Sequence, residues 1–472
     1  MAELILAIDV GTTSTRAAVL TPDGAIAGIA AFALTSTSPR LGEVEQDAEA
    51  VWTATQAAIA GALAAASRTP ADLAAVGVTT QRASAVVWDK ASGEVRSPLV
   101  VWNDLRGAER ARELMAAGFP LAPQQAATKL EAIFAAIDAA PATLAWGNID
   151  SFLIHRLTGG AHLTDRSQAW PCGYLALPDL GWNAQLIDHQ GLDAATFPRL
   201  VDTWGELAMT SAAVLGAAVP IAADVADQQS ALMAHGDAPG TAKMTFGTVG
   251  AFDLATGGTF MFPAPGLPPL VVSSVAGDTR FCIEGMALSA GSAIDWLRGA
   301  FALGDYGAFE ALAGSVGDTA GAAYLPGQPG PGAPQGDPGR RAVLTGLSSA
   351  VTRAHLARVG LEGLAFRARE IIDAVYALTD FAPPAALGVD GGLSRSAVFL
   401  QILADLTGRP VRRHATVEAT LLGAAMAAGR GAGLLTEADV AAMIRFDAPV
   451  APSLTASAGL ERFEAWRGEV LG

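Results

Sequence analysis

One stretch near the start of the chain constrains the fold more than any other: residues 4–20, LILAIDVGTTSTRAAVL. Leu4 to Ile8 is an uncharged apolar run, and Thr15 to Leu20 is a second apolar run that only Arg16 interrupts. Two β-compatible runs joined by a short turn with a glycine predict a β-hairpin. The turn, Gly11 to Ser14, adds three hydroxyl side chains to that glycine, a composition suited to holding phosphate oxygens.

A carboxylate, Asp9, stands at the end of the first predicted strand. There it can hold Mg²⁺, directly or through water, against phosphates that the turn binds. Arg16 is also placed to bind these phosphates. Alternatively, it is a solvated residue of the second strand. The alternative for the whole stretch is an ordinary hairpin with a polar turn, because short Gly-Thr patterns recur by chance.

The hairpin plan occurs a second time about half a chain later. Residues 241–258, TAKMTFGTVGAFDLATGG, again place a Gly247-Thr248 turn between two apolar runs. Two such hairpins predict two related halves with a nucleotide held between them. A third motif, Val389 to Gly392, runs from a strand end into a glycine pair, with Ser394 and Ser396 at a helix start. Glycines there allow close approach of a base or a phosphate.

The composition bounds the class of protein. The chain has 472 residues, of which 51% are hydrophobic and 16% charged, so we expect a globular protein with two domains. The formal net charge is −16 and no Lys/Arg cluster is visible, which argues against a nucleic-acid partner. The Ala-rich run Ala57 to Ala66 is too short to span a bilayer, so no membrane association is expected.

Two further features point to a compartment. Cys172 and Cys282 form neither a disulfide framework nor a metal pattern. The N-terminal stretch carries Glu3 and Asp9 without a basic leader, unlike a signal peptide. A reduced cytoplasm is therefore the expected location.

Strand and helix patterns alternate along the chain. We expect a helix from Asp47, as its cap, to about Ala66. The other expected helices are 106–115, 124–139, 146–157, 229–234, 290–302, 355–378, 396–407 and 415–429. The other expected strands are 25–34, 73–78, 85–88, 219–223, 271–275, 281–284 and 386–389, with Asp224 and Asp227 at the exit of 219–223. Residues 235–240 are expected to be a hinge, and 327–339 a surface loop.

Six motifs follow one another in a characteristic order: Asp9 to Arg16, Thr79 to Arg82, Val101 to Asp104, Ala226 to Ser230, Phe246 to Thr248 and Asp390 to Gly392. Together they resemble the FGGY carbohydrate kinases over nearly the whole chain, most closely the glycerol kinase branch. The resemblance implies an α/β fold of two ribonuclease H-like domains of the actin-like ATPase superfamily, with a nucleotide cleft between them. It implies ATP-dependent phosphorylation of a polyol or sugar. The expected domains are residues 1–236, for substrate and phosphate, and 237–472, for nucleotide.

The resemblance also implies roles for single residues. It places the catalytic base, which orients and deprotonates the attacking hydroxyl, at Asp227; Asp224 competes on sequence alone. The implied substrate-binding residues are Arg82, Trp102, Asp104 and Gln228. The implied nucleotide- and phosphate-binding residues are Gly11, Thr12, Thr13, Ser14, Arg16, Thr248, Gly291, Asp295, Gly392 and Ser396, with ATP and Mg²⁺ as cofactors and Asp9 as metal ligand. The structural alternatives are a helix cap for Asp227, a surface arginine for Arg82 and a core residue for Trp102.

The chain departs from the glycerol kinase pattern at informative positions. Ala83 stands where that branch has a glutamate, and Gln124 where it has a tyrosine; both lost groups contact glycerol there. Glycerol itself is therefore in doubt, and Asp104 is an alternative hydroxyl acceptor. Asp295 replaces a glutamine and Ser396 an asparagine. The chain is also short between residues 211 and 219, where some glycerol kinases carry a regulatory loop.

Alternatives of different classes stay open at this point. One is a pentulose kinase of the same family, similar to xylulokinases. Another is a non-catalytic, nucleotide-dependent binding protein of the same superfamily, which would keep the phosphate hairpins but lack a sugar site. Arg82, Trp102 and Asp227 favour the kinase. The oligomeric state is left open, with a homodimer as one candidate.

Overall fold

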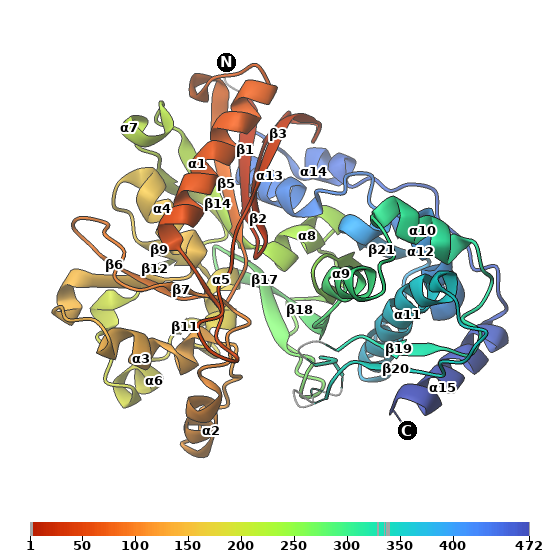
Figure 1. Ribbon diagram of the computed structural model, residues 1–472. Coiled ribbons are helices and arrows are strands. Elements are labelled where there is room, and N and C mark those ends of the chain that lie inside the picture. Colours follow the sequence, from red (N-terminus) through yellow and green to blue (C-terminus); the bar gives the residue numbers. More distant parts are fainter. Residues whose placement is uncertain (1–2, 328–329, 335, 337–339, 472) are drawn as a thin grey trace. The chain divides into compact units, whose positions relative to one another are not determined.

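The computed structural model describes residues 3–327, 330–334, 336 and 340–471, and parts of the loop predicted at 327–339 lie outside this range. The described residues divide into two compact units. The first contains residues 1–234, 270–280 and 420–443, and the second contains residues 235–269, 281–419 and 444–472. Each unit is built on a mixed sheet with helices, as predicted for an α/β protein (Figure 1).

The first sheet has the strand order β13-β14-β5-β1-β2-β3. Its strands are β1 (Leu4–Val10), β2 (Ser14–Leu20), β3 (Ile26–Ala33), β5 (Leu73–Thr80), β13 (Trp204–Met209) and β14 (Pro220–Ala226). The hairpin predicted at residues 4–20 is confirmed, because β1 and β2 pair antiparallel. The strands β5 and β14 run parallel to β1 and to each other, and their apolar side chains are buried on both faces.

Helix α1 (Ala48–Ala65) packs on strands β2 and β3 (Figure 1). Its predicted cap is confirmed, since the Asp47 carboxylate accepts hydrogen bonds from the backbone N–H groups of Glu49 and Ala50. One stripe of the helix, including Val51, Ile59 and Leu63, is buried, so amphipathic periodicity set its orientation.

The remaining elements of this half are short. The helices are α2 (Ala108–Ala116), α3 (Leu130–Ala135), α4 (Ile149–Thr158), α5 (Arg166–Ala169), α6 (Ala184–His189), α7 (Ala212–Leu215) and α8 (Asp227–His235). The short strands are β4 (Glu45–Gln46), β6 (Val86–Asp89), β7 (Leu99–Val100), β8 (Leu144–Gly147), β9 (Leu163–Asp165), β10 (Leu175–Ala176), β11 (Gly181–Trp182) and β12 (Arg199–Val201).

Two helix predictions in this half are wrong in extent. The helix predicted at 124–139 is a short 3₁₀ turn followed by α3. The helix predicted from Trp146 begins at Ile149, because residues 144–147 pair with β6 as strand β8. In both places apolar residues at helical spacing are buried, the first set in a satellite core and the second mostly in the main core, and burial stabilises other backbone conformations equally well.

The second sheet has the order β17-β18-β16-β15-β21-β22. Its strands are β15 (Ala242–Phe246), β16 (Gly250–Gly257), β17 (Pro269–Val275), β18 (Asp278–Ala287), β21 (Leu387–Asp390) and β22 (Val411–Arg413). The other elements are α9 (Gly291–Ala300), α10 (Tyr306–Gly314), α11 (Arg353–Ala377), α12 (Ala397–Thr407), α15 (Ala456–Leu471), β19 (Ala323–Leu325) and β20 (Val343–Thr345). The predicted second hairpin is confirmed as β15 and β16.

The two sheets share a plan. In the first, β1 pairs antiparallel with β2 and parallel with β5. In the second, β15 pairs antiparallel with β16 and parallel with β21. The repeat predicted from the two hairpins is therefore present in the sheet topology.

Helices α13 (Ala419–Gly431) and α14 (Glu437–Met443) return to the first unit late in the chain. In Figure 1 the blue α13 lies beside the red and orange strands of the first sheet. A Cβ atom on Gly77 of β5 would lie 2.5 Å from the carbonyl oxygen of Ala424, and one on Gly423 would lie 1.8 Å from that of Ser230. Glycine at these positions allows the close backbone approach.

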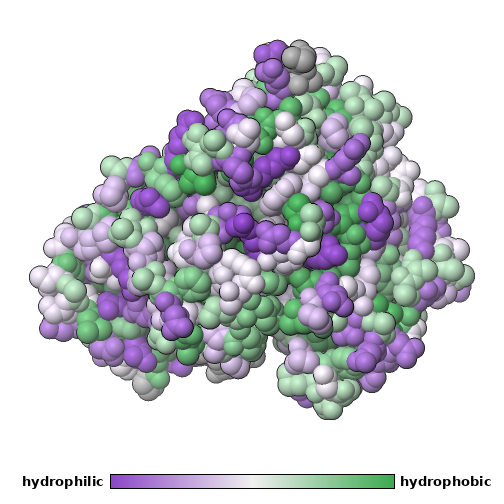
Figure 2. All heavy atoms as spheres, turned by 180° about the vertical axis from the view of Figure 1, so that it is seen from behind, coloured by the Kyte–Doolittle hydropathy of each residue, from purple (hydrophilic) through white to green (hydrophobic). Residues whose placement is uncertain are grey.

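The surface carries a mixture of side chains. On the face shown in Figure 2, hydrophilic and hydrophobic residues are interspersed. Among the helices of the described residues, none combines the length and apolar character that a membrane crossing requires.

Candidate functional site

Three neighbouring parallel strands of the first sheet end at the same level. Val10 of β1 and Ala226 of β14 are both in register with Thr80 of β5. The residues that follow are Gly11, Gln81 and Asp227, and they therefore lie along one edge of the sheet. Open α/β sheets bind ligands beyond the carboxyl ends of their strands.

The predicted phosphate turn, Gly11 to Ser14, is held by backbone hydrogen bonds. The N–H of Gly11 donates to the carbonyl oxygen of Ser14 at 3.0 Å, and the N–H of Leu34 donates to that of Thr13 at 2.9 Å. Thr13 is exposed, and Thr12 and Ser14 are half-buried. The turn thus presents hydroxyl groups at the sheet edge from a fixed backbone.

Thr12, in the first predicted motif, forms hydrogen bonds with residues of two other predicted motifs. Its hydroxyl donates to Oε1 of Gln81 at 2.9 Å and accepts from the indole Nε1–H of Trp102 at 3.0 Å. Its carbonyl oxygen accepts from Nε2 of Gln46 at 2.7 Å. The structure therefore brings Trp102, a predicted substrate residue, against the predicted phosphate turn. Gln46, on the short strand β4, was not predicted, because nothing in its sequence neighbourhood signals this role.

Asp9 and Arg16 face each other across the hairpin. They are register partners on β1 and β2, and their side chains form an ion pair. The Asp9 side chain is only 1% exposed, whereas that of Arg16 is 31% exposed. The predicted metal ligand and the predicted phosphate ligand thus form one unit at the base of the turn.

Arg82 and Asp227 come together from adjacent strand ends. Nε of Arg82 lies 3.4 Å from Oδ1 of Asp227, and Nη1 of Arg82 donates to Oε1 of Gln229 at 3.3 Å. The side chains of Arg82 and Asp227 are 10% and 23% exposed, so both can be reached by a small ligand. The N–H of Gln228 donates to Oδ1 of Asp227 at 2.8 Å, which fixes the carboxylate at the start of α8.

Asp224 is in a different environment. The prediction that it stands at the strand exit is wrong, because β14 continues to Ala226 and buries the Asp224 side chain completely. Its Oδ2 accepts from the backbone N–H of Asp165 at 2.9 Å, and Asp150 lies beside it. Burial raises the pKa of Asp224 well above its usual value, and the charges of Asp150 and Asp165 raise this pKa further.

The Asp104 carboxylate is buried and accepts hydrogen bonds from neighbouring groups. Its Oδ2 accepts from the N–H of Val44 at 2.7 Å and from Nη2 of Arg106 at 2.8 Å. The same arginine also donates to Glu45 at 2.7 Å. Asp104 therefore anchors the segment that follows Trp102.

Two of the positions that depart from the glycerol kinase pattern, Ala83 and Gln124, have different local settings. Ala83 has a φ of +58°, a left-handed backbone conformation that residues other than glycine seldom adopt. The carbonyl oxygen of Gln124 accepts from Nζ of Lys129 at 3.0 Å, and the same Nζ donates to Val101 at 3.2 Å. Burial lowers the pKa of Lys129 to about 8. Lys129 was not predicted, yet it joins the segments that carry Trp102 and Gln124.

In the second unit, the turn of the second hairpin supports the start of α9. The N–H of Gly291 donates to the carbonyl oxygen of Gly247 at 2.9 Å, and the Ser292 hydroxyl donates to that of Thr248 at 3.0 Å. A Cβ atom on Gly291 would lie 2.8 Å from the Gly247 carbonyl oxygen. The predicted nucleotide residues Thr248 and Gly291 are therefore adjacent. Asp295, also on α9, accepts from Arg298 at 3.0 Å and from the Tyr306 hydroxyl at 2.8 Å.

The glycine pair lies against the same hairpin. Gly391 has a φ of +84°, and a Cβ atom there would lie 2.5 Å from the carbonyl oxygen of Phe246. Gly392 is exposed and has open space around it. Ser396 caps α12, because its hydroxyl accepts from the N–H of Phe399 at 3.0 Å, and it donates to Glu310 at 2.7 Å.

Two buried pairs of ionisable side chains in the second unit were not predicted. Nζ of Lys243 lies 2.8 Å from Oδ2 of Asp253, its register partner across the β15–β16 hairpin. Nε2 of His235 lies 2.8 Å from Oδ2 of Asp390. Burial alone would raise the pKa of Asp390, but the His235 hydrogen bond and the Lys243 charge lower it below the usual value. A Lys and an Asp at facing positions of a predicted apolar hairpin are the signal that would have found the first pair.

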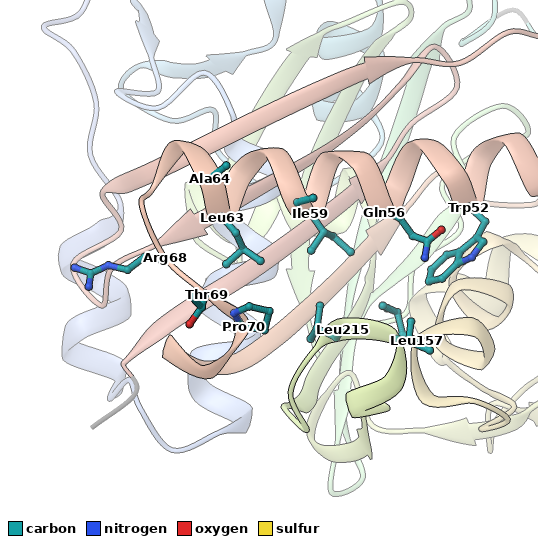
Figure 3. Close-up of a pocket in the computed structure, with 12 residues that line it drawn as sticks. Trp52, Gln56, Ile59, Leu63, Ala64, Arg68, Thr69, Pro70, Leu157 and Leu215 are labelled. Carbon is teal, nitrogen blue, oxygen red and sulfur yellow. The ribbon is translucent and has the colours of Figure 1, made fainter.

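A cavity of about 370 Å³ in the first unit lies away from all of these residues. Figure 3 shows Ile59 and Leu63 of α1 facing Leu215 of α7 across it, with Pro70 beside them. None of the predicted site residues is among the described residues that line it. We assign it no ligand.

Comparisons with known proteins cover both halves of the chain. The model of the N-terminal domain of the FGGY family of carbohydrate kinases matches residues 4–234, and that of the C-terminal domain matches residues 243–432. A glycerol kinase of Geobacter sp. (strain M21) is 36% identical over 484 residues, covering 98% of this chain and 97% of that protein.

Solved structures are similar over the same extent. A glycerol kinase of Plasmodium falciparum, solved with ADP, is 22% identical with a TM-score of 0.87, covering 99% of this chain and 97% of that one. A xylulose kinase from Rhodospirillum rubrum is 26% identical with a TM-score of 0.79, covering 99% of this chain and 97% of that one. The predicted fold class is confirmed.

Proposed function

Since this chain belongs to the FGGY family of carbohydrate kinases, and is an ATP-dependent phosphotransferase with an alcohol acceptor, we propose that it phosphorylates a small polyol or sugar other than glycerol. We further propose Asp227 as its general base. The observation that carries the base assignment is the placement of a partly exposed Asp227 carboxylate 3.4 Å from Arg82 at the carboxyl ends of β5 and β14. A base must reach the proton that it abstracts, and Asp227 is accessible in this way.

In the proposed reaction, the Asp227 carboxylate takes the proton of one substrate hydroxyl. The resulting oxygen forms a bond to the γ-phosphorus of ATP while the bond from that phosphorus to the β–γ bridging oxygen breaks, releasing ADP. The hydrogen bond from the Gln228 N–H holds the carboxylate oxygen in place. The Arg82 guanidinium lies where it can clamp a second substrate hydroxyl and stabilise the Asp227 charge.

The phosphate groups of ATP would be bound by short polar turns. In the first unit these are the N–H and hydroxyl groups of Thr12, Thr13 and Ser14, with Arg16 behind them. In the second unit they are Thr248 and the start of α9, whose N-terminus favours negative charge. Gly392 leaves open space for the nucleotide.

Mg²⁺ fits the groups at the first turn. It usually takes one or two carboxylates and completes its shell with phosphate oxygens and water. Asp9 supplies one carboxylate at the base of the turn, where it forms an ion pair with Arg16. When bound there, the ion would neutralise charge on the phosphates.

Two departures from the glycerol kinase pattern support a substrate other than glycerol. A site with Ala83 lacks the carboxylate that the glycerol kinase branch places after the arginine, and Gln124 replaces an aromatic wall with an amide. A site built for a hydroxyl rejects substrates steeply when one hydrogen-bond partner is absent. A pentulose is the second candidate, since the xylulose kinase from Rhodospirillum rubrum shares the fold over its full length.

A substrate panel tests the proposal. Release of ADP from ATP and Mg²⁺ would be measured with glycerol, four- and five-carbon polyols and pentuloses at equal concentrations. We expect the highest kcat/KM for a substrate longer than glycerol. Glycerol as the best substrate would contradict the interpretation of Ala83 and Gln124. Sedimentation of the same preparation would determine the oligomeric state, for which a homodimer is one candidate. Fractionation of the source cells would check the predicted cytoplasmic location.

A further inference from the structure

A second cavity lies at the opposite end of the second sheet from the glycine pair. It has a volume of about 240 Å³ and is lined at the start of β15 by Thr241 and Ala242 and just before β21 by Ala386. The candidate nucleotide loops follow the other ends of these two strands, at Phe246 and Asp390. All of the residues that line this cavity belong to the second unit.

One arginine of the cavity has no counterion among the described residues. Arg412 lines it, and its guanidinium carbon lies 3.8 Å above the ring centroid of Phe446. Across the described part of the chain, Nε of Arg412 has no hydrogen-bond acceptor and no carboxylate forms a salt bridge with this side chain. The next residue, Arg413, differs sharply, because its Nε donates to Asp447 at 2.7 Å. A partly buried, unpaired guanidinium is a binding group for an anion.

The other walls mix polar and apolar groups, with Gly240 and Thr241 beside prolines and an aromatic ring. Pro239, Pro384 and Phe446 face the cavity together with His235. The His235 ring packs against Phe446 at 5.3 Å and against His414 at 5.0 Å, measured between ring centroids. Such walls suit a ligand with a short apolar body beside its charged group.

His235 connects this cavity to the nucleotide loop. His235 is one of the residues that line the cavity, and its Nε2 lies 2.8 Å from Oδ2 of Asp390, the residue before the glycine pair. The ring is held from the other side by Gly388, where a Cβ atom would lie 2.5 Å from Nδ1. A ligand that shifts this ring therefore shifts the partner of Asp390.

We propose that the cavity is an effector site for a small organic anion, a carboxylate or phosphate monoester with a short apolar chain, coupled to nucleotide binding through His235 and Asp390. The anionic group pairs with Arg412, and the chain packs on Phe446 and the two prolines. The formal net charge of −16 repels anions over most of the protein, so specific binding requires a local unpaired cation of this kind. This site goes beyond the phosphoryl transfer proposed above and does not depend on which substrate is phosphorylated.

Binding would be measured by titration calorimetry on the full chain, with butyrate and butyl phosphate as probes and butanol as the uncharged control. We expect saturable binding of at least one anion and none of butanol. Arg412→Gln should weaken the affinity for the anion at least tenfold. Arg413→Gln removes a neighbouring charge as the matched control, and its affinity should stay within about twofold of that of the unchanged protein. Binding of neither anion, or equal binding to Arg412→Gln and the unchanged protein, would overturn the site. A difference between the two probes identifies the anionic group.

Coupling would be measured as ADP affinity with and without saturating probe. Linkage requires that the probe change ADP affinity by the same factor by which ADP changes probe affinity, and coupling factors of about 5- to 150-fold are usual. We expect a change of about fivefold in the unchanged protein and in Arg413→Gln, and none in Arg412→Gln. An anion that binds through Arg412 but leaves ADP affinity unchanged would overturn the coupling. Because these readouts need no turnover, they are independent of the proposed base and substrate.

Discussion

Nε of Arg82 lies 3.4 Å from Oδ1 of Asp227, and this contact joins two motifs that are far apart in the sequence. It forms because β5 and β14 are parallel neighbours, so the residues after Thr80 and Ala226 meet at one sheet edge. The guanidinium charge of Arg82 thus lies beside the carboxylate that is proposed as the general base. The same sheet edge carries the predicted phosphate turn after β1.

Replacing Asp227 by Asn should reduce kcat by about 10²- to 10⁴-fold, the usual contribution of a positioned base. ADP affinity should change little, since the proposed nucleotide contacts lie on other residues. Asp224→Asn is the matched control and should keep kcat, because Asp224 is buried in β14. Steady-state kinetics and ADP titration on both variants would check this. Inactivity of Asp224→Asn with near-native activity of Asp227→Asn would reverse the assignment.

Replacing Ala83 by Glu should raise kcat/KM for glycerol by about tenfold or more, because a hydrogen bond to a charged group contributes about 1.5–3 kcal/mol. Ala83→Gln, of the same size but neutral, should give a smaller gain. Both variants keep a side chain at the φ of +58° that Ala83 already adopts. The measurement is the ratio of kcat/KM for glycerol to that for the best panel substrate. An unchanged ratio in Ala83→Glu would show that residue 83 does not select the substrate.

Replacing Gly391 by Ala should destabilise the protein by about 2 kcal/mol or more, since the new Cβ meets backbone at a positive φ. Gly392→Ala has open space and should change stability by less than about 0.5 kcal/mol. Denaturant unfolding would measure both. ADP titration of the stable Gly392→Ala variant then tests its predicted nucleotide role, and unchanged affinity would remove Gly392 from the site.

Replacing Asp224 by Asn should stabilise the protein at neutral pH. Burial, and then Asp150 and Asp165, raise the pKa of Asp224 in the fold, so the folded state holds a proton that the unfolded state releases above about pH 4. The unchanged protein therefore loses stability as the pH rises above 4, by up to about 1.4 kcal/mol per pH unit, and Asn does not titrate. Unfolding free energies between pH 4 and 8 should show the advantage of Asp224→Asn growing with pH. An advantage that is flat or shrinks with pH would contradict the raised pKa.

Replacing Asp9 by Asn should raise the Mg²⁺ concentration that gives half the maximal rate, because one carboxylate ligand is lost. Arg16→Gln removes the other half of the same ion pair and serves as the control for lost structure. Rates measured across a Mg²⁺ series would separate the two. If both variants shift the Mg²⁺ requirement equally, the pair is structural and Asp9 is not the metal ligand.

The sequence by itself determined the local elements and the motif order. Hairpin turns, the Asp47 cap and the long amphipathic helices depend on neighbours within a few residues, so their patterns were sufficient. The family membership also followed from the sequence, because its motifs are short and ordered along the chain. The repeat of the hairpin predicted the shared plan of the two sheets.

Only the tertiary structure decided which polar groups are accessible and which are buried. Asp224 and Asp227 are three positions apart, and the length of β14 buries the first and leaves the second at the sheet edge. The return of α13 to the first unit, the Lys243–Asp253 pair and the unpaired Arg412 all depend on contacts between distant segments. Burial and pairing are properties of the packed chain, and local periodicity cannot specify them.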